Sequence, residues 1–230
     1  MVRRSAVSEL TLRKAIIAAA RDMNRLGVNQ GTSGNVSARS GGSMLITPTA
    51  TPYDELSPPM IARMELEGEE AWTGPLKPSS EWRFHRDIYR VRNDAGAVVH
   101  THATYATALS MLRREIPAAH YMIAAFGGPT IRCTDYAPYG TQALSELVVE
   151  GLRDRNGVLL GNHGMIVIGH NLSEAMWRAV ELETLAKQFF LASLAGKPII
   201  LPDDEIFRTV ERFKGYGAGK RVASKRPGKR

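Results

Sequence analysis

Apolar residues near the start of the chain recur every three or four positions. Between residues 8 and 26 they are Leu12, Ala15, Ile16, Ala19, Met23 and Leu26. This spacing places them on one face of a helix, and Gly27 is suited to end it. Similar patterns predict further helices over 81–92, 103–112, 141–154, 172–195 and 203–213.

Short apolar runs bounded by glycine or polar turns predict the strands. They lie at 36–39, 44–47, 62–68, 97–103 and on both sides of 162–164. Gly41 and Gly42 suit a hairpin turn between the first two. The apolar stretch 116–128 fits a short helix or a buried loop. Because strands and helices do not alternate strictly, we expect one mixed α/β domain with a central, mainly antiparallel sheet flanked by helices.

Length and composition are ordinary for a globular protein, with 230 residues, 43% of them hydrophobic and 23% charged. Cys133 is the only cysteine, so no intrachain disulfide can form. That fits a reducing cytosol. No apolar run approaches the roughly 20 residues of a membrane span. The first residues also lack the apolar core of a signal peptide. We therefore expect a cytoplasmic protein with no membrane partner.

The net charge of +7 is concentrated at the C-terminus. Residues 217–230 carry six basic side chains and no acid, which leaves the remainder close to neutral. We expect residues 1–216 to form the catalytic domain and 217–230 a flexible basic tail. A weak contact with a polyanion is the alternative function for this tail. A nucleic-acid partner is disfavoured, because the tail has no aromatic residues on which bases could stack.

Histidines provide the first candidate chemistry. His100 and His102 follow an apolar run in VVHTHATY, and residues two apart on a strand point to the same face. Both could reach one metal ion, and His163 in GNHG could supply a third ligand from a distant strand. The alternative is a hydrogen-bonded histidine pair at a strand end. His85 fits a histidine on the helix surface or at the core edge.

An acid and several hydroxyls could complete such a site. Glu81 starts a helix in SSEWRFH, where it could ligate a metal, carry protons or simply favour the helix dipole. Ser79 and Ser80 are candidate N-caps, and a helix N-terminus with hydroxyls is suited to bind an anion. The loop 31–35, with Thr32, and the segment 47–49 add further donors. Each could also be an ordinary turn.

Taken in order, several motifs resemble the class II aldolase/adducin family over roughly residues 8–216. They are GVNQGTSGNVS, MLITPT, PSSEWRFH, VVHTHA, IPAAHYMIAAFGG, YGT, LLGNHG and FKGYG. The resemblance implies a zinc ion held by His100, His102 and His163, with Glu81 as the fourth ligand. Cobalt and manganese are alternatives. It also implies a phosphate site at Gly34, Asn35, Thr49, Ser79 and Ser80.

The family further implies reversible cleavage of a ketose 1-phosphate to dihydroxyacetone phosphate and an aldehyde. L-fuculose 1-phosphate and 5-deoxyribulose 1-phosphate are the expected kinds of substrate. The metal stabilises developing negative charge as a Lewis acid, and Glu81 acts as the acid and base. Tyr121 from a neighbouring subunit and Tyr216 near the C-terminus match the family's catalytic tyrosines. Its active enzymes are homotetramers with sites between subunits.

Two positions depart from the family pattern. Ala50 follows Thr49 where most aldolases of this type have glycine, and a positive φ there would strain an alanine. Tyr139 stands where a phenylalanine precedes Gly-Thr in the family's fuculose enzymes. Its hydroxyl could change which aldehyde is preferred.

Alternative functions remain open at this point. A pentulose 5-phosphate 4-epimerase resembles the chain in its histidine motifs, although such enzymes typically carry aspartate in place of Glu81. A metal-dependent sugar-phosphate decarboxylase or dehydratase would suit the same residues. A non-catalytic adducin-like binding module is the alternative from a different class, and it has no need of three metal-facing imidazoles.

Overall fold

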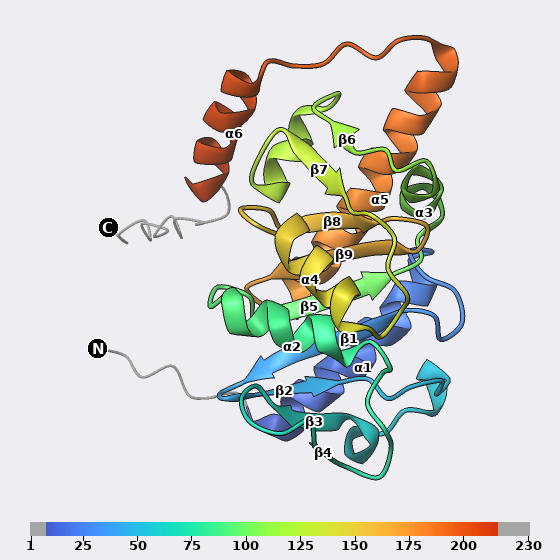
Figure 1. Cartoon of the computed structure of the whole chain (residues 1–230), viewed down its shortest axis with the longest axis vertical. Helices are drawn as coiled ribbons and strands as arrows, with labels where there is room; N and C mark the ends of the chain where they lie inside the picture. The colour runs from blue at the N-terminus through green and yellow to red at the C-terminus, as the bar shows by residue number, and fades with distance from the viewer. Residues whose placement is uncertain (1–7, 216–230) are drawn as a thin grey trace, which may run out of the picture.

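The computed structural model describes residues 8–215 (Figure 1). The α-helices are α1 (Glu9–Arg25), α2 (Trp82–Val91), α3 (Thr104–Met111), α4 (Gln142–Gly151), α5 (Leu172–Ala195) and α6 (Asp203–Gly215). The strands are β1 (Asn35–Ser40), β2 (Ser43–Ile46), β3 (Ala62–Glu65), β4 (Trp72–Thr73), β5 (Ala97–Thr101), β6 (Ile116–Pro117), β7 (Thr130–Cys133), β8 (Gly157–Leu160) and β9 (Gly164–Gly169). Short 3-10 helices are η1 (Tyr53–Glu55), η2 (Pro58–Met60) and η3 (Tyr121–Phe126).

The described strands form one sheet of nine in the order β4-β3-β2-β1-β5-β9-β8-β7-β6. Neighbouring strands are antiparallel except for β7 and β8. The predicted hairpin is present, because Ser40 pairs with Ser43 around the two glycines. The mixed, mainly antiparallel sheet predicted from the sequence is therefore confirmed. Strand β7 was not predicted.

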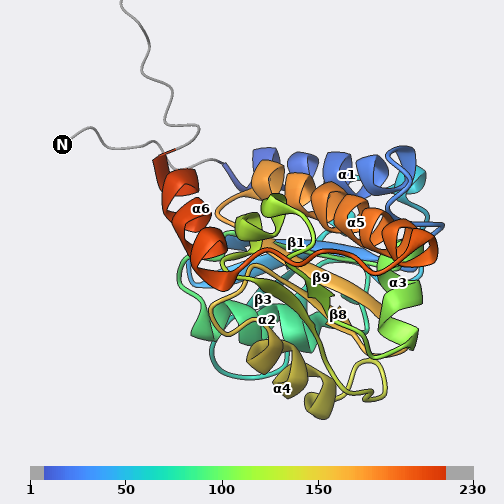
Figure 2. The ribbon, with the colours of Figure 1, turned by 90° about the horizontal axis from the view of Figure 1, so that it is seen from above.

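Helices cover both faces of the sheet. Helices α1 and α5 lie on one face, and α2 and α4 lie on the other (Figure 2). Ile16 and Leu182 belong to the hydrophobic core on the first side, and Ile88 and Val148 to that on the second. Strands β5, β8 and β9 are buried between these helices. Their ends therefore keep fixed positions relative to one another. Among the described helices, none is both long and apolar enough to cross a membrane.

The start of α2 differs from the prediction. Neither serine caps the helix: Glu81 is the residue before the first turn, and no side chain makes a capping hydrogen bond there. Ser79 Oγ instead accepts a hydrogen bond from the Glu81 N–H at 3.3 Å. The reason is tertiary, because the Glu81 side chain is directed toward histidines from other elements.

His85 also differs from the prediction. It is completely buried on the sheet-facing side of α2, next to Phe84 and one turn before Ile88 and Tyr89. The interpretation as a surface or core-edge histidine was therefore wrong. The apolar stretch 116–128 forms β6 and η3, and the side chain of His120 caps η3 by accepting a hydrogen bond from the Met122 N–H in its first turn.

Candidate metal centre

Two adjacent strand ends bring the three predicted histidines together. His100 lies in β5, paired with Asn35 on one side and Ile166 on the other, and His102 follows directly after the strand. His163 lies in the tight connection between β8 and β9, which is closed by the pairing of Leu160 with Gly164. Since β9 is the direct neighbour of β5, this connection places His163 beside the other two.

The three imidazoles converge on one point. One ring nitrogen from each lies within 4.8 Å of the others, and the His100 and His102 Nε2 atoms are 3.2 Å apart. The ring centroids are 4.8–5.0 Å apart and the ring planes are nearly perpendicular. Ligand atoms around a tetrahedral zinc ion lie about 3.3–3.6 Å apart, given bonds of about 2.0–2.2 Å. The His100–His102 separation is close to this range, and all three imidazoles face the point that a shared metal ion would occupy.

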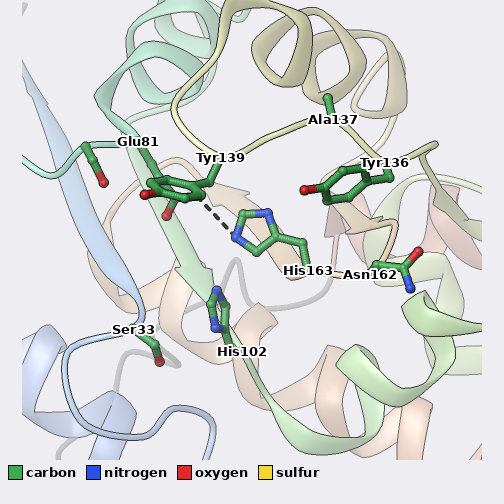
Figure 3. A pocket seen from close by; sticks show the side chains of 9 residues that line it. Ser33, Glu81, His102, Tyr136, Ala137, Tyr139, Asn162 and His163 are labelled. Carbon is green, nitrogen blue, oxygen red and sulfur yellow. Dashed lines mark ion pairs between the residues drawn. The ribbon is translucent and has the colours of Figure 1, made fainter.

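The Glu81 carboxylate completes the cluster. Its Oε2 lies 3.2 Å from His100 Nε2. Its Oε1 lies 3.2 Å from His163 Nε2, the ion pair drawn as a dashed line in Figure 3. Oε1 is buried, yet it has no hydrogen-bond partner among the described residues. A buried carboxylate oxygen normally has such a partner, so this atom fits a metal or proton ligand. Three nitrogens and one oxygen are a donor set that binds zinc.

Burial and charge act in opposite directions on these groups. Burial alone would raise the pKa of Glu81, but the neighbouring His100 and His163, each 3.2 Å from one of its oxygens, outweigh it and lower that pKa below its usual range. Burial lowers the pKa of His102 to about 4, and His100 and His163 contribute to the shift. Near neutral pH the cluster therefore contains an ionised carboxylate and a neutral His102 with a free lone pair.

Neighbouring backbone fixes how the histidines point. His100 Nδ1 lies 2.9 Å from the Met165 carbonyl oxygen, which can only accept, so Nδ1 carries the proton and Nε2 faces the cluster. Gly164 keeps room for His102, since a Cβ there would lie 2.5 Å from the Thr101 oxygen and 2.9 Å from His102 Cδ2. This close approach explains the glycine that follows His163.

A pocket of about 330 Å³ opens over the cluster (Figure 3). Its lining residues are Ser33, Ser80, Glu81, His102, Tyr136, Ala137, Tyr139, Asn162 and His163. Five of the predicted site residues are among them, namely Ser80, Glu81, His102, His163 and Tyr139. Ser33 belongs to the predicted loop 31–35 and Asn162 to the motif GNHG, although neither was named as a site residue. Tyr136 and Ala137 lie just before the motif YGT and were not predicted.

Helix α2 holds Tyr139 at the pocket. Arg83 donates a hydrogen bond from Nη1 to the Gly140 carbonyl at 2.9 Å, which ties the turn after Tyr139 to the helix. Gly140 has φ of +73°, and a Cβ there would lie 2.8 Å from the Ser80 carbonyl oxygen. The turn therefore lies directly against Ser80, and the Tyr139 ring projects, 71% exposed, at the pocket edge.

The predicted phosphate-binding segments lie side by side. The N–H of Ser79 donates to the Thr47 carbonyl oxygen at 3.0 Å, and the N–H of Thr49 donates to the Lys77 carbonyl oxygen at 3.1 Å. The Val36 N–H donates to Thr47 Oγ1 at 3.1 Å, which links the end of loop 31–35 to this pair. The structure thus brings the three segments together, with Ser79 buried and Ser80 exposed.

Individual members of the predicted phosphate set differ in exposure. Thr32, Thr49 and Ala50 are exposed, whereas Gly34 and Asn35 are buried. Gly34 is packed closely, because a Cβ there would lie 2.5 Å from the His100 carbonyl oxygen. The Asn35 side chain is directed to Glu81 rather than to the surface.

Of the two predicted catalytic tyrosines, the structure describes only Tyr121, and it lies away from this pocket. Tyr121 begins η3, is 51% exposed and stacks on His120, and it does not line the pocket. Tyr216 and the tail 217–230 lie outside the described residues. A contribution from Tyr121 would therefore require a second subunit.

Ala50 has φ of +50°, the left-handed conformation that the comparison with the family's glycine suggested. Replacing Ala50 by glycine is expected to raise the free energy of unfolding by about 1 kcal/mol, because an L-side chain is strained there. Thermal unfolding should shift upward by about 2–4 °C. The matched control is Ala71→Gly, at an exposed alanine without positive φ. An equal effect of both substitutions would contradict the strain at Ala50.

Residues 14–190 match the family model described as Class II Aldolase and Adducin N-terminal domain. The chain belongs to this family. It is 50% identical over 208 residues to the L-fuculose phosphate aldolase of Escherichia coli strain K12, with 90% of this chain and 95% of the relative covered. It is 47% identical over 217 residues to the 5-methylthioribulose-1-phosphate/5-deoxyribulose-1-phosphate aldolase of Rhodospirillum rubrum, with 94% and 97% covered.

A solved structure agrees with these relatives. An L-fuculose 1-phosphate aldolase superposes with a TM-score of 0.87 at 35% identity, covering 91% of this chain and 99% of that chain. The family resemblance and the class II aldolase fold predicted from the motifs are confirmed. The chain is an enzyme of the aldolase class, a carbon–carbon lyase, and not a non-catalytic binding module.

Proposed function

We propose that this aldolase is metal-dependent and cleaves a ketose 1-phosphate reversibly between C3 and C4. The products would be dihydroxyacetone phosphate and a short aldehyde. The observation that carries the proposal is the convergence of His100, His102, His163 and Glu81 on one point, where His102, His163 and Glu81 line a pocket and His100 is buried behind them. The aldolases to which the chain is similar support the reaction type.

His100, His102 and His163 would hold the metal, with Glu81 as the fourth ligand before substrate binds. Three imidazoles and a carboxylate suit zinc, with cobalt or manganese as alternatives. Such a metal supplies Lewis acidity, which offsets the negative charge that develops on the ketose oxygens during cleavage. A lysine Schiff base is then unnecessary.

Glu81 would move the proton at C3. Breaking the C3–C4 bond leaves its electron pair on C3, which must gain one proton while the C4 hydroxyl loses one. Glu81, once it has taken up a proton in exchange for that one, would return it to C3 and complete dihydroxyacetone phosphate. In the reverse direction its carboxylate removes that proton. Oε1 is suited to this role, because it is buried at the pocket and holds no hydrogen bond within the described chain.

The phosphate would bind between the loop 31–35 and the start of α2. Ser80 lines the pocket, and Ser79 lies beside Thr47 through a backbone hydrogen bond. We include Thr32, Gly34, Asn35, Thr49 and Ala50 in this site on the family resemblance. Backbone N–H groups and hydroxyls at a helix start favour an anion.

Tyr121 would act on the hydroxyl of the aldehyde half, taking its proton in cleavage and returning it in synthesis. Its exposed position away from the pocket supports a donation from one subunit to the next. We therefore propose a homotetramer with sites between subunits, as the family resemblance implies. Tyr216 would close over the aldehyde from the C-terminus. Light scattering of the purified protein tests the oligomeric state.

Candidate substrates differ only in the aldehyde half. L-fuculose 1-phosphate, 5-deoxyribulose 1-phosphate and 5-methylthioribulose 1-phosphate should be offered to the zinc-loaded enzyme, with ribulose 5-phosphate as the epimerase control. Release of dihydroxyacetone phosphate from at least one 1-phosphate is expected. Conversion of ribulose 5-phosphate to xylulose 5-phosphate without triose release would instead favour the epimerase. Release of carbon dioxide or water from a sugar-acid phosphate would favour a decarboxylase or dehydratase.

Replacing Tyr139 by phenylalanine is expected to change which of these ketose 1-phosphates the enzyme prefers. The aldehyde half of L-fuculose 1-phosphate carries a hydroxyl beside its carbonyl, whereas that of 5-deoxyribulose 1-phosphate does not. Because the family's fuculose enzymes carry phenylalanine here, losing the Tyr139 hydroxyl at the pocket edge should raise the ratio of kcat/KM for the fuculose substrate over the deoxyribulose substrate by about two- to tenfold. Tyr105→Phe, on α3 against Phe190, is the control. An unchanged ratio would contradict a role of Tyr139 in specificity.

A further inference from the structure

A continuous line of buried hydrogen bonds leads from Glu81 into the core beneath α2. Asn35 Nδ2 lies 2.9 Å from Glu81 Oε2, and Asn35 Oδ1 lies 2.5 Å from His85 Nε2. His85 Nδ1 lies 2.7 Å from Ser37 Oγ, which lies 2.8 Å from the Tyr89 hydroxyl. All five side chains belong to residues that are 5% exposed or less.

The carboxylate at one end determines the direction of every hydrogen bond in the line. An ionised Glu81 can only accept, so Asn35 must turn its Nδ2 toward it and its Oδ1 toward His85. His85 must then carry its proton on Nε2. Its Nδ1 accepts from the Ser37 hydroxyl, and Ser37 in turn accepts from Tyr89. Each donor therefore points toward Glu81.

His85 is held in the neutral form that this arrangement needs. It is completely buried, and burial together with the charge of His100 lowers its pKa to about 3. A neutral imidazole has one donor and one acceptor, and the line uses both. A buried polar network with every member paired specifies one geometry.

We propose that Asn35 and His85 are positioning residues that hold Glu81 for proton transfer. With His85 donating to Asn35 Oδ1, the Asn35 amide cannot rotate by half a turn and present its oxygen to the carboxylate. Asn35 then fixes Glu81 Oε2, which leaves Oε1 as the atom that exchanges the proton. The same hydrogen bond would hold the Glu81 carboxylate in place while it moves the proton at C3. This inference rests on the proposed function of Glu81.

Two substitutions at His85 separate positioning from packing. His85→Leu removes the donor to Asn35, and His85→Gln replaces it with an amide N–H at a similar distance along the side chain. Ile88→Val, a buried change one turn along α2 and outside the line, is the stability control. We expect His85→Leu to lower kcat about 10- to 100-fold with little change in KM, and to weaken zinc binding. His85→Gln should recover most of both losses.

Nitrogen NMR of the wild-type protein with labelled histidine provides a test that needs no activity and no variant. His85 should be neutral and protonated on Nε2 over the whole range in which the protein is folded. A proton on Nδ1 would overturn the proposal, because Asn35 would then have no donor to hold it. Equal kinetic losses for His85→Leu, His85→Gln and Ile88→Val would also overturn it.

Failure of the proposed function of Glu81 can be distinguished from failure of the inference about His85 and Asn35. If the wild-type enzyme released no triose from any ketose 1-phosphate, the proposed function would fail. The NMR spectrum and the zinc affinities of the His85 variants would still decide whether the line of hydrogen bonds positions Glu81. Unchanged zinc affinity in His85→Leu, with Nε2 protonated in the wild type, would overturn the claim that His85 acts on the metal site through Asn35.

Discussion

His163→Ala is expected to lose bound metal and to reduce triose release by roughly 10³-fold or more, since Lewis-acid stabilisation is worth several kcal/mol. His163 is the member of the cluster that comes from the β8–β9 connection, and its Nε2 lies 3.2 Å from Glu81 Oε1. Alanine removes one of the three nitrogens and leaves the strands intact. Elemental analysis of the purified variant and a coupled assay for dihydroxyacetone phosphate measure the two effects.

His170→Ala is the matched control for that variant. His170 lies just after β9 and is exposed. Its Nδ1 lies 2.9 Å from the Asp94 carbonyl oxygen, and it makes no contact with the histidine cluster among the described residues. Its removal should leave metal content and turnover unchanged. Full metal content and activity in His163→Ala would contradict the metal centre at these histidines.

Glu81→Gln is expected to have the second large effect, through proton transfer rather than metal loss. Glutamine keeps the size of the side chain and an oxygen for Asn35, but it cannot carry a proton to C3. Removal of a general acid and base costs about 10²–10⁴-fold, which should appear in kcat. With three histidines intact, the variant should retain more zinc than His163→Ala. Single-turnover measurements of triose release provide the rate.

Glu67→Gln removes the same charge elsewhere and is the control for Glu81→Gln. Its carboxylate is 83% exposed and contacts Arg90 at 3.6 Å. Little change in kcat is expected for this variant. If Glu81→Gln turned over substrate as fast as the wild type, another group would have to move the proton at C3.

Hydrophobic periodicity predicted most of the fold because long helices and buried strands leave a regular pattern. Helix α1 spans Glu9–Arg25, within one residue of the predicted 8–26 at each end, and Ser8 caps it. Strand β7 was missed because its sequence TIRC has no apolar run, and only one of its four residues is buried. Its place is set by parallel pairing with β8, a contact between distant segments that periodicity does not record.

The histidine cluster could be predicted because two local rules coincide. Alternation along β5 aligns His100 with His102, and the tight connection around His163 ends at its neighbouring strand. The position of Glu81 was predicted, but not the way in which α2 begins. A capping preference is worth about 1 kcal/mol, and contacts with the histidines and Asn35 outweigh it here.

The role of His85 could not be read from the sequence. Its partners Asn35 and Ser37 lie about fifty positions earlier in the chain, on a strand that only the folded sheet places under α2. The pocket residues Ser33, Tyr136 and Asn162 are similar cases. Each is brought to the site by a loop whose path depends on tertiary contacts.

Metal-dependent release of dihydroxyacetone phosphate tests the central claim most directly. The wild-type protein should be assayed with ketose 1-phosphates before chelation, after metal removal by a chelator, and after zinc is restored. The account predicts triose release that disappears with the metal and returns with zinc, and that stays low in His163→Ala after the same treatment. Triose release that persists in the fully metal-free protein would contradict it.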